Sequence, residues 1–190
     1  EGGGEYRILK DGKVFDKVGV NFSKVYGRFP KKFQKNIPGA HKDPRFWASG
    51  ISLVMHMKNP LIPAMHFNTR YISTTQQWFG GGMDLTPYYG FDEDAVHFHQ
   101  TLKTILDPYD KKLYAEFKKN CDEYFYLKHR KEPRGIGGIF YDDFNSLGFD
   151  KSFNLNKSVG DVFLNAYLPI LQRRKDIHFT EKERDFHEVY

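Results

Sequence analysis

Three consecutive glycines, Gly80 to Gly82, are followed closely by Asp84, and this segment has the clearest chemical potential in the sequence. Glycine leaves the backbone bare, so another group can approach it closely. Asp84 adds a hydrogen-bond acceptor beside it. Two interpretations stay open. In one, a flat ligand lies over the glycines and donates N–H groups to Asp84; in the other, the glycines form a bulge and Asp84 caps a turn. No Gly-Lys-Ser/Thr motif follows, so this is not a phosphate loop.

Polar side chains also recur at alternate positions of two apolar segments that a proline-containing turn separates. Residues two apart in a strand face the same side of a sheet. Ser52 therefore shares a face with His56, and His66 shares a face with Asn68 and Arg70. The pattern indicates either a binding row or the wet face of a half-exposed sheet, and the two interpretations are equally supported.

Three histidines raise the question of a metal site. His99 falls on the apolar face of a predicted helix, where a lone histidine is more often a satisfied core residue than a ligand. His129 ends the next predicted helix. With His56 these imidazoles could bind a divalent cation, as in a metal-dependent hydrolase. No compact HxxxH spacing is present, so spacing alone argues against the metal.

Two arginines, Arg130 and Arg134, precede a second glycine-rich segment. Guanidinium groups bind carboxylates bidentately, so with Arg70 they could hold several carboxylates of one ligand. The alternative is a solvated helix end with ordinary surface charges. Asp142 and Asp143 follow the next strand and are interpreted as a turn cap rather than as a base or a metal site.

The elements that must position these residues predict an α+β fold: one antiparallel sheet flanked by helices on both faces. Alternation and turn residues predict strands at 6–10, 13–22, 46–57, 64–74, 77–84 and 137–141. Helical spacing predicts helices at 92–107, 109–130, 150–174 and 180–190. Pro169 is expected to kink or end the third helix, and Thr180 with Glu183 forms a capping box at the fourth. Segment 1–4 is expected to be loose, and 28–44 to be a surface loop.

Composition sets broader limits. A chain of 190 residues fits a single domain, 1–190. The net charge of +5 suits an anionic partner, which could be nucleic acid, acidic lipid or a carboxylate-rich metabolite. A nucleic-acid-binding module is the less favoured class, because the aromatic residues fall mostly at core spacing.

No apolar run is long enough for a transmembrane helix. Cys121 is the only cysteine and excludes an intrachain disulfide, which suits the cytoplasm. A mitochondrial form that has lost a targeting segment is an alternative. Because the chain begins with Glu1 and ends at Tyr190, we expect a fragment or a processed form.

Long ordered motifs resemble the oxygen-dependent coproporphyrinogen III oxidase family. Among them are GVNFSKVYG at 19–27, ISLVMHMKNPLIPAMHFNTRY at 51–71 and WFGGGMDLTPYYGFDEDAVHFH at 78–99. Further matches lie at 121–130, 134–145 and 166–175, so nearly all of the chain is covered. The resemblance implies oxidative decarboxylation of two propionates of coproporphyrinogen III to vinyl groups. Oxygen would be the co-substrate, with no organic cofactor, and the enzyme would be a homodimer.

The resemblance also implies roles for the residues singled out above. His66 matches the proposed proton donor, Asp84 the acceptor for pyrrole N–H groups, and Arg70 a residue of the catalytic and binding set. The positions matching substrate-binding residues are Ser52, Asn68, Thr69, Arg70, Arg130 and Arg134, and those matching a divalent metal site are His56, His99 and His129. Family chains continue beyond the equivalent of Tyr190, so an inactive or merely tetrapyrrole-binding remnant is the alternative.

Overall fold

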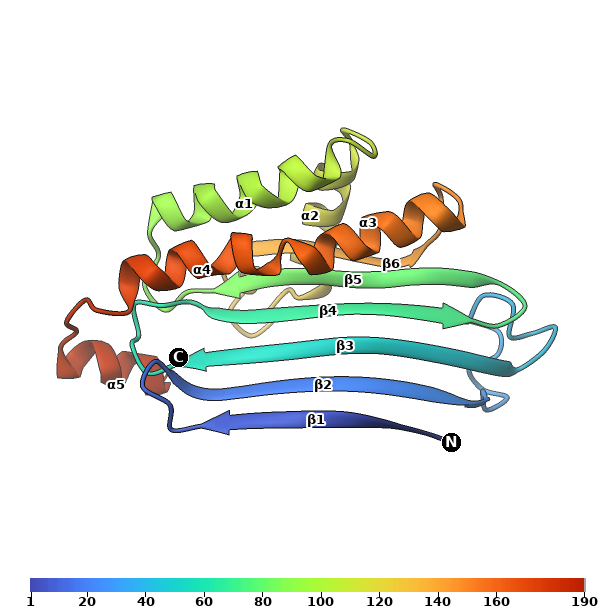
Figure 1. The fold of residues 1–190 in the computed structure, drawn as a ribbon, viewed down its shortest axis with the longest axis horizontal. Coiled ribbons are helices and arrows are strands. Elements are labelled where there is room, and N and C mark those ends of the chain that lie inside the picture. Colours follow the sequence, from blue (N-terminus) through green and yellow to red (C-terminus); the bar gives the residue numbers. More distant parts are fainter. Residues whose placement is uncertain (190) are drawn as a thin grey trace.

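The computed structural model describes residues 1–189, and its centre is one six-stranded antiparallel sheet in the order β1-β2-β3-β4-β5-β6 (Figure 1). Its strands are β1 (Gly2–Lys10), β2 (Phe15–Arg28), β3 (Arg45–Met57), β4 (Ala64–Ser73), β5 (Gln77–Thr86) and β6 (Gly137–Phe144). Its helices are α1 (Asp92–Leu106), α2 (Leu113–Tyr124), α3 (Phe149–Asp161), α4 (Phe163–Arg174) and α5 (Glu181–Val189). The predicted α+β class and antiparallel pairing are confirmed.

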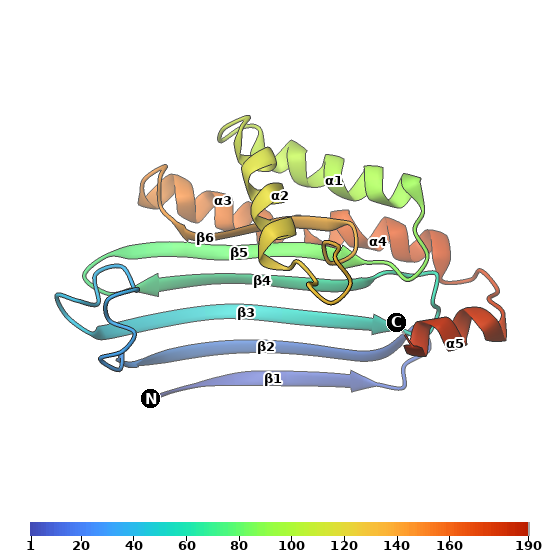
Figure 2. The same cartoon turned by 180° about the vertical axis from the view of Figure 1, so that it is seen from behind.

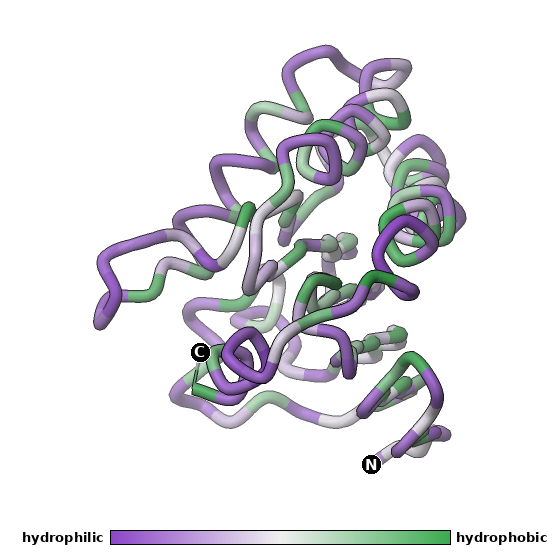
Figure 3. Tube along the Cα trace, turned by 90° about the vertical axis from the view of Figure 1, so that its left-hand side faces the viewer, coloured by the Kyte–Doolittle hydropathy of each residue, from purple (hydrophilic) through white to green (hydrophobic). Residues whose placement is uncertain are grey.

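Helices cover the two faces of the sheet unequally. α3 and α4 lie along one face, which we call the helix-covered face, with α1 behind them and α2 packed on β6 (Figure 1). On the opposite, open face, α5 lies near the strand ends and an irregular connection between α2 and β6 reaches over β5 (Figure 2). The end view shows this difference between the two sides (Figure 3). The open face is therefore where a ligand can reach the strands.

The hydrophobic core lies between the helix-covered face and the helices. Alternation in β4 and β5 places residues such as Phe67 and Met83 on that face, where they are buried with Phe98 of α1. Phe117 of α2 stacks on Tyr141 of β6, with ring centroids 4.7 Å apart. This packing fixes β4, β5 and β6 as a rigid floor, and the opposite side of the same strands carries the polar residues.

Several predicted boundaries are wrong: the strand predicted at 13–22 is Phe15–Arg28, and the strand predicted at 137–141 continues to Phe144. Two further differences have a backbone explanation. Residues 1–4 are not loose, because β1 begins at Gly2 and its glycines pair with β2. The second helix ends at Tyr124 instead of residue 130. Tyr124 is 68% exposed, and the buried residues of α2 are Leu113, Phe117 and Cys121. The chain then forms a tight turn closed by the Leu127–Glu132 bridge.

The predicted third helix is two helices, and its break lies at Val162 rather than at Pro169. Pro169 sits inside α4 and has no N–H for the carbonyl of Asn165 one turn earlier. That carbonyl instead lies 3.0 Å from Nε2 of His97 in α1. The side chain of His97 thus replaces the missing backbone bond, and α4 continues through the proline.

The predicted capping box opens α5. The Thr180 backbone N–H donates to the Glu183 carboxylate at 2.6 Å, and the Glu183 N–H donates to the Thr180 hydroxyl at 3.2 Å. Residue 190, the last of the predicted helix, lies outside the described residues. Within residues 1–189, no helix is both long enough and apolar enough to cross a membrane.

Candidate functional site

Strand register brings the predicted polar residues together on the open face. Ser52 of β3 lies opposite Asn68 of β4, and His66 of β4 lies opposite Asp84 of β5. Arg70 lies opposite Gly80. Because these strands are neighbours and the residues share one parity, the side chains form a continuous polar patch. The binding-row interpretation therefore has the geometry it needs.

Asp84 is the centre of this patch and is only 3% exposed. Arg134 donates to both of its carboxylate oxygens, from Nε at 2.9 Å and from Nη2 at 2.8 Å. Nδ1 of His66 lies 3.5 Å from the same carboxylate. Such a two-pronged contact fixes both the position and the direction of a carboxylate. Asp84 and Arg134, for which separate roles were predicted, are thus one ion pair.

The backbone after Arg134 explains how its guanidinium reaches β5. Gly135 has φ of +55°, a left-handed conformation, and a Cβ there would lie 2.3 Å from the Leu85 carbonyl oxygen. Only glycine fits both requirements without strain. The next residue, Ile136, donates its N–H to that same Leu85 carbonyl at 3.1 Å. The turn is therefore held directly against β5, with Arg134 aimed at Asp84.

Two aromatic residues that sequence reasoning did not single out complete this part of the site. The Phe125 ring lies 3.8 Å from the Arg134 guanidinium carbon. Phe140 of β6 packs edge-to-face on Phe125 at 5.3 Å and lies opposite Gly82. Alternation along β6 could have placed Phe140 on the open face. No sequence signal shows that the chain beyond α2 returns to this spot.

The patch encloses a hollow of about 170 Å³ between β3, β4 and β5. Its lining includes Ser52, His66, Asn68, Asp84, Phe125, Arg134 and Phe140. A second hollow of about 310 Å³ continues from it across β2 and shares Ser52 and Asn68. A large, flat ligand can therefore lie along several strands and reach Asp84 at one end.

The glycines of β5 have both a packing and a surface role. A Cβ on Gly82 would lie 2.2 Å from the Ile139 carbonyl oxygen, so glycine allows β5 and β6 to approach. A Cβ on Gly80 would lie 2.7 Å from Nε of Arg70. Gly81 faces the opposite side, where a Cβ would meet the Tyr141 hydroxyl. Gly82 thus lines the hollow next to Asp84, whereas Gly80 lies beneath the side chains of Arg70 and Asp142.

Arg70 is held toward β6. Its Nη2 lies 2.7 Å from Oδ2 of Asp142, and its Nη1 donates to Asn68 at 3.1 Å. Asp142 also accepts the Asp143 N–H at 3.0 Å, but both aspartates lie within β6, so the predicted cap of a turn after the strand is wrong and Asp142 is instead an ion-pair partner. Thr69 lies between Asn68 and Arg70, so alternation directs its side chain to the helix-covered face. Only its backbone can serve a ligand on the open face.

The structure does not bring the three predicted metal ligands together. His99 is bonded at both ring nitrogens, to the Ile136 carbonyl at 3.0 Å and to the Tyr114 hydroxyl at 3.1 Å. His129 is exposed in the turn after α2. Among residues 1–189, no group of three His, Cys, Asp or Glu side chains is arranged to hold a metal ion. As placed here, the His56, His99 and His129 set does not fit a cation.

His99 has a structural role that predicts a pH dependence of stability. Burial lowers the pKa of His99 below its usual value near 6.5, and burial does the same to His56 and His187. The unfolded chain therefore takes up protons first as the pH falls. We expect the free energy of unfolding to be level above about pH 7 and to decrease below about pH 6.5, toward the lowered pKa values.

Urea denaturation between pH 7.5 and 5 measures this effect. His99→Gln keeps a donor and an acceptor but cannot titrate, so the decrease should become shallower. His41→Gln, at an exposed loop position, is the matched control. An unchanged slope in His99→Gln relative to that control would contradict the assignment.

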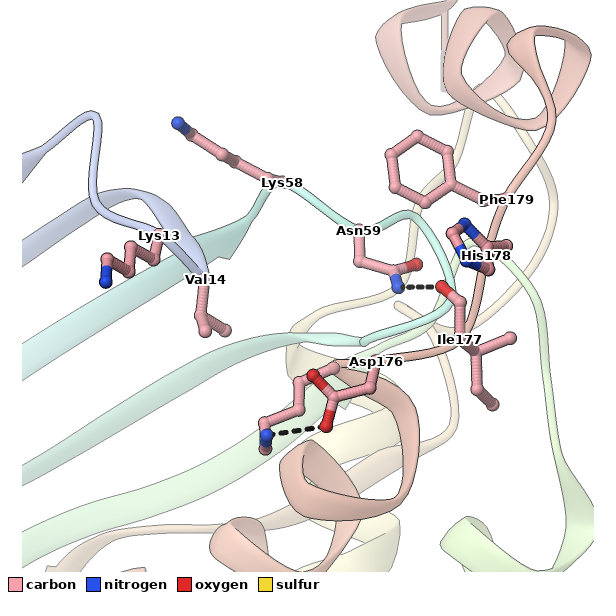
Figure 4. Close-up of a pocket in the computed structure, with 9 residues that line it drawn as sticks. Lys13, Val14, Lys58, Asn59, Asp176, Ile177, His178 and Phe179 are labelled. Carbon is pink, nitrogen blue, oxygen red and sulfur yellow. Dashed lines mark hydrogen bonds and ion pairs between the residues drawn. The ribbon is translucent and has the colours of Figure 1, made fainter.

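A larger hollow of about 360 Å³ lies away from the patch, between the end of α4 and the ends of β2 and β3 (Figure 4). Three of its polar side chains, those of Asn59, Lys175 and Asp176, are bonded within the protein. Lys175 pairs with Asp176 at 2.6 Å, and the Asn59 amide donates to the carbonyls of Arg174 and Ile177. It contains none of the predicted site residues, so its contacts join α4 to the β3–β4 connection.

The fold is an α+β domain whose open sheet face carries a buried carboxylate, cationic side chains and glycines in one polar patch. The family model for coproporphyrinogen III oxidase matches residues 1–190. The chain therefore belongs to the coproporphyrinogen III oxidase family.

Named relatives agree with this membership. The chain is 53% identical over 185 residues to an oxygen-dependent coproporphyrinogen-III oxidase of Rickettsia bellii (strain RML369-C). It is 51% identical over the same length to that of Rickettsia rickettsii (strain Sheila Smith). Each match covers 97% of this chain and 66% of the relative, so the chain spans about two thirds of the relatives' length.

Proposed function

We propose that the protein catalyses the oxidative decarboxylation of two propionate side chains of coproporphyrinogen III to vinyl groups. Each conversion takes one propionate, one O₂ and one proton, and gives one vinyl group, one CO₂ and one H₂O₂. The C–C bond to the carboxylate breaks, one hydrogen leaves the neighbouring side-chain carbon, and O₂ accepts the two electrons. The observation that carries this proposal is the buried Asp84 carboxylate, held by Arg134 beside Gly82 in the hollow of the open face.

The arrangement suits a flat ring with central N–H donors and peripheral carboxylates. Asp84 is the acceptor for the N–H groups, and the missing side chain of Gly82 lets the ring approach β5. Arg134 holds the carboxylate in position before the ring arrives. His66, 3.5 Å from Asp84, is placed to supply the proton on the same side of the ring.

Charge and water exclusion support the same reaction. Arg70 lies at the edge of the patch, where a peripheral carboxylate can reach its remaining N–H donors. Phe125 and Phe140 line the β6 side of the hollow with apolar rings, which would limit the access of water to a bound ring. The reaction moves two electrons from the side chain to O₂ as CO₂ leaves, and a preorganised, apolar-lined cleft favours that charge movement.

An assay of the purified protein with coproporphyrinogen III tests the proposal. In air, we expect the product to fluoresce as protoporphyrin after chemical oxidation, with one O₂ consumed for each CO₂ released. Without O₂ the product should not form. A folded protein that gives no product in air would overturn the proposed activity.

Other expected properties belong to the same proposal. We expect a homodimer, no organic cofactor and a cytoplasmic location, which sedimentation, absorbance spectra and cell fractionation test. The divalent cation at His56, His99 and His129 stays a prediction. Metal analysis of the purified protein beside His99→Gln tests it, because a cation held by that set should be lost in the variant.

A further inference from the structure

The second hollow on the open face, which extends onto β2, is not explained by the residues assigned so far. Strand register places Asn21 of β2 opposite Ser52, which lies opposite Asn68. In the next row, Ser23 lies opposite Gly50, which lies opposite Arg70. The hollow of about 310 Å³ is lined by both rows. Its floor therefore crosses three strands and continues beyond Ser52.

The polar side chains of this floor include several donors that have no protein partner. Within residues 1–189, the side chains of Asn21, Ser23 and Ser52 make no hydrogen bond to the protein. Asn68 accepts from Arg70 through its oxygen, which leaves its two N–H donors unused. Arg70 is the only charged side chain in the lining, and no carboxylate lines the hollow. A ligand group with several acceptors and a negative charge complements this set.

The shape of the floor depends on Gly50. A Cβ at this position would lie 2.8 Å from the Thr69 carbonyl oxygen and 3.0 Å from Cβ of Arg70. A side chain there would both disturb the pairing with β4 and fill the middle of the hollow. Because Gly50 has none, Ser23 and Arg70 face one another across an open space that a carboxylate can enter.

We propose that Asn21 and Ser23, with Ser52, bind a peripheral carboxylate of the substrate. This inference rests on the proposed function and adds β2 to the binding site. Neighbouring strands are about 4.8 Å apart, so β2 lies about 10 Å from β4, which carries His66. A carboxylate bound at Asn21 is therefore not the one at His66. It is a non-reacting group whose capture orients the ring for the reaction at the other end.

A charge series at residue 21 tests the inference. Asn21→Asp keeps the size of the side chain but replaces a donor with a negative charge, and Asn21→Lys adds a positive one. Asn36→Asp and Asn36→Lys, in the exposed loop after β2, are matched controls. The probes are coproporphyrinogen III for steady-state rates and coproporphyrin III, the oxidised ring with the same four carboxylates, for equilibrium binding by fluorescence.

We expect Asn21→Asp to raise KM and the coproporphyrin Kd about tenfold with kcat little changed, and Asn21→Lys to lower both constants. Values equal to the Asn36 controls, or equal shifts for both charges, would overturn the carboxylate subsite. Should the unchanged protein bind coproporphyrin and show the charge series without turnover, the subsite stands and the proposed activity fails. Should it neither bind nor turn over, both are overturned.

Discussion

Asp84→Asn is expected to lower kcat by about a hundredfold or more, the scale seen when one preorganised electrostatic contact is removed from an active site. The amide keeps the shape of the side chain but loses the negative charge. It cannot accept from Arg134 and ring N–H groups on both arms, because one arm is now a donor. Initial rates with coproporphyrinogen III measure the loss, and the KM should change less than kcat.

Stability must be followed in the same variant. Arg134 would lose its ion-pair partner, although its side chain is 24% exposed and water partly replaces the contact. We expect a cost of about 1–3 kcal/mol in urea denaturation. Asp107→Asn is the control, because Asp107 pairs with Lys103 on the solvent side of α1. A folded Asp84→Asn protein with the turnover of that control would remove Asp84 from the site.

Gly135→Ala is expected to reduce both stability and turnover. Its left-handed φ costs an alanine about 1–2 kcal/mol, and the new Cβ would also press on the backbone of Leu85 and Thr86. We expect a total loss of about 3 kcal/mol of unfolding free energy. Turnover should fall at least tenfold, because a displacement of about 1 Å at a positioning group can cost up to a hundredfold.

The matched control is the same substitution in a helix. Gly160 lies in α3, and a Cβ there meets no atom within 4 Å. Gly160→Ala should therefore stabilise the protein by about 0.5–1 kcal/mol and leave turnover unchanged. Equal effects of the two alanines would show that the turn after Arg134 does not hold the site.

Local patterns predicted much of the fold. The strands at 46–57 and 64–74 follow from alternation and from prolines that end them, and their parity placed Ser52, His66 and Asn68 on one face. The third helix was predicted through Val162, because nothing local marks a break there. Pro169, which was expected to kink or end the helix, lies inside α4. His97, which is distant in the sequence, supplies the hydrogen bond to the Asn165 carbonyl that the proline cannot make.

The site was predicted in its parts but not in its connections. Asp84 and Arg134 were each singled out, yet their ion pair joins residues 50 apart and depends on a turn at Gly135. Phe125 and Phe140 were not predicted as site residues either, because they lie far from Asp84 in the sequence. Helical spacing predicted that α2 would continue past Phe125. The chain instead turns back after Tyr124, where Phe125 packs on Phe140 of β6, and no local sequence signal marks this turn.

Because Asp84 and Arg134 are already paired with each other, a ligand that binds either residue must replace that contact. A ring that offers only N–H donors competes with the guanidinium for a carboxylate that is already engaged. A molecule that offers only a carboxylate competes with Asp84 for Arg134. One that carries both can give each residue a new partner in the same step, so neither charge is left alone. Selectivity would then come from the combination of the two groups, not from the strength of either contact.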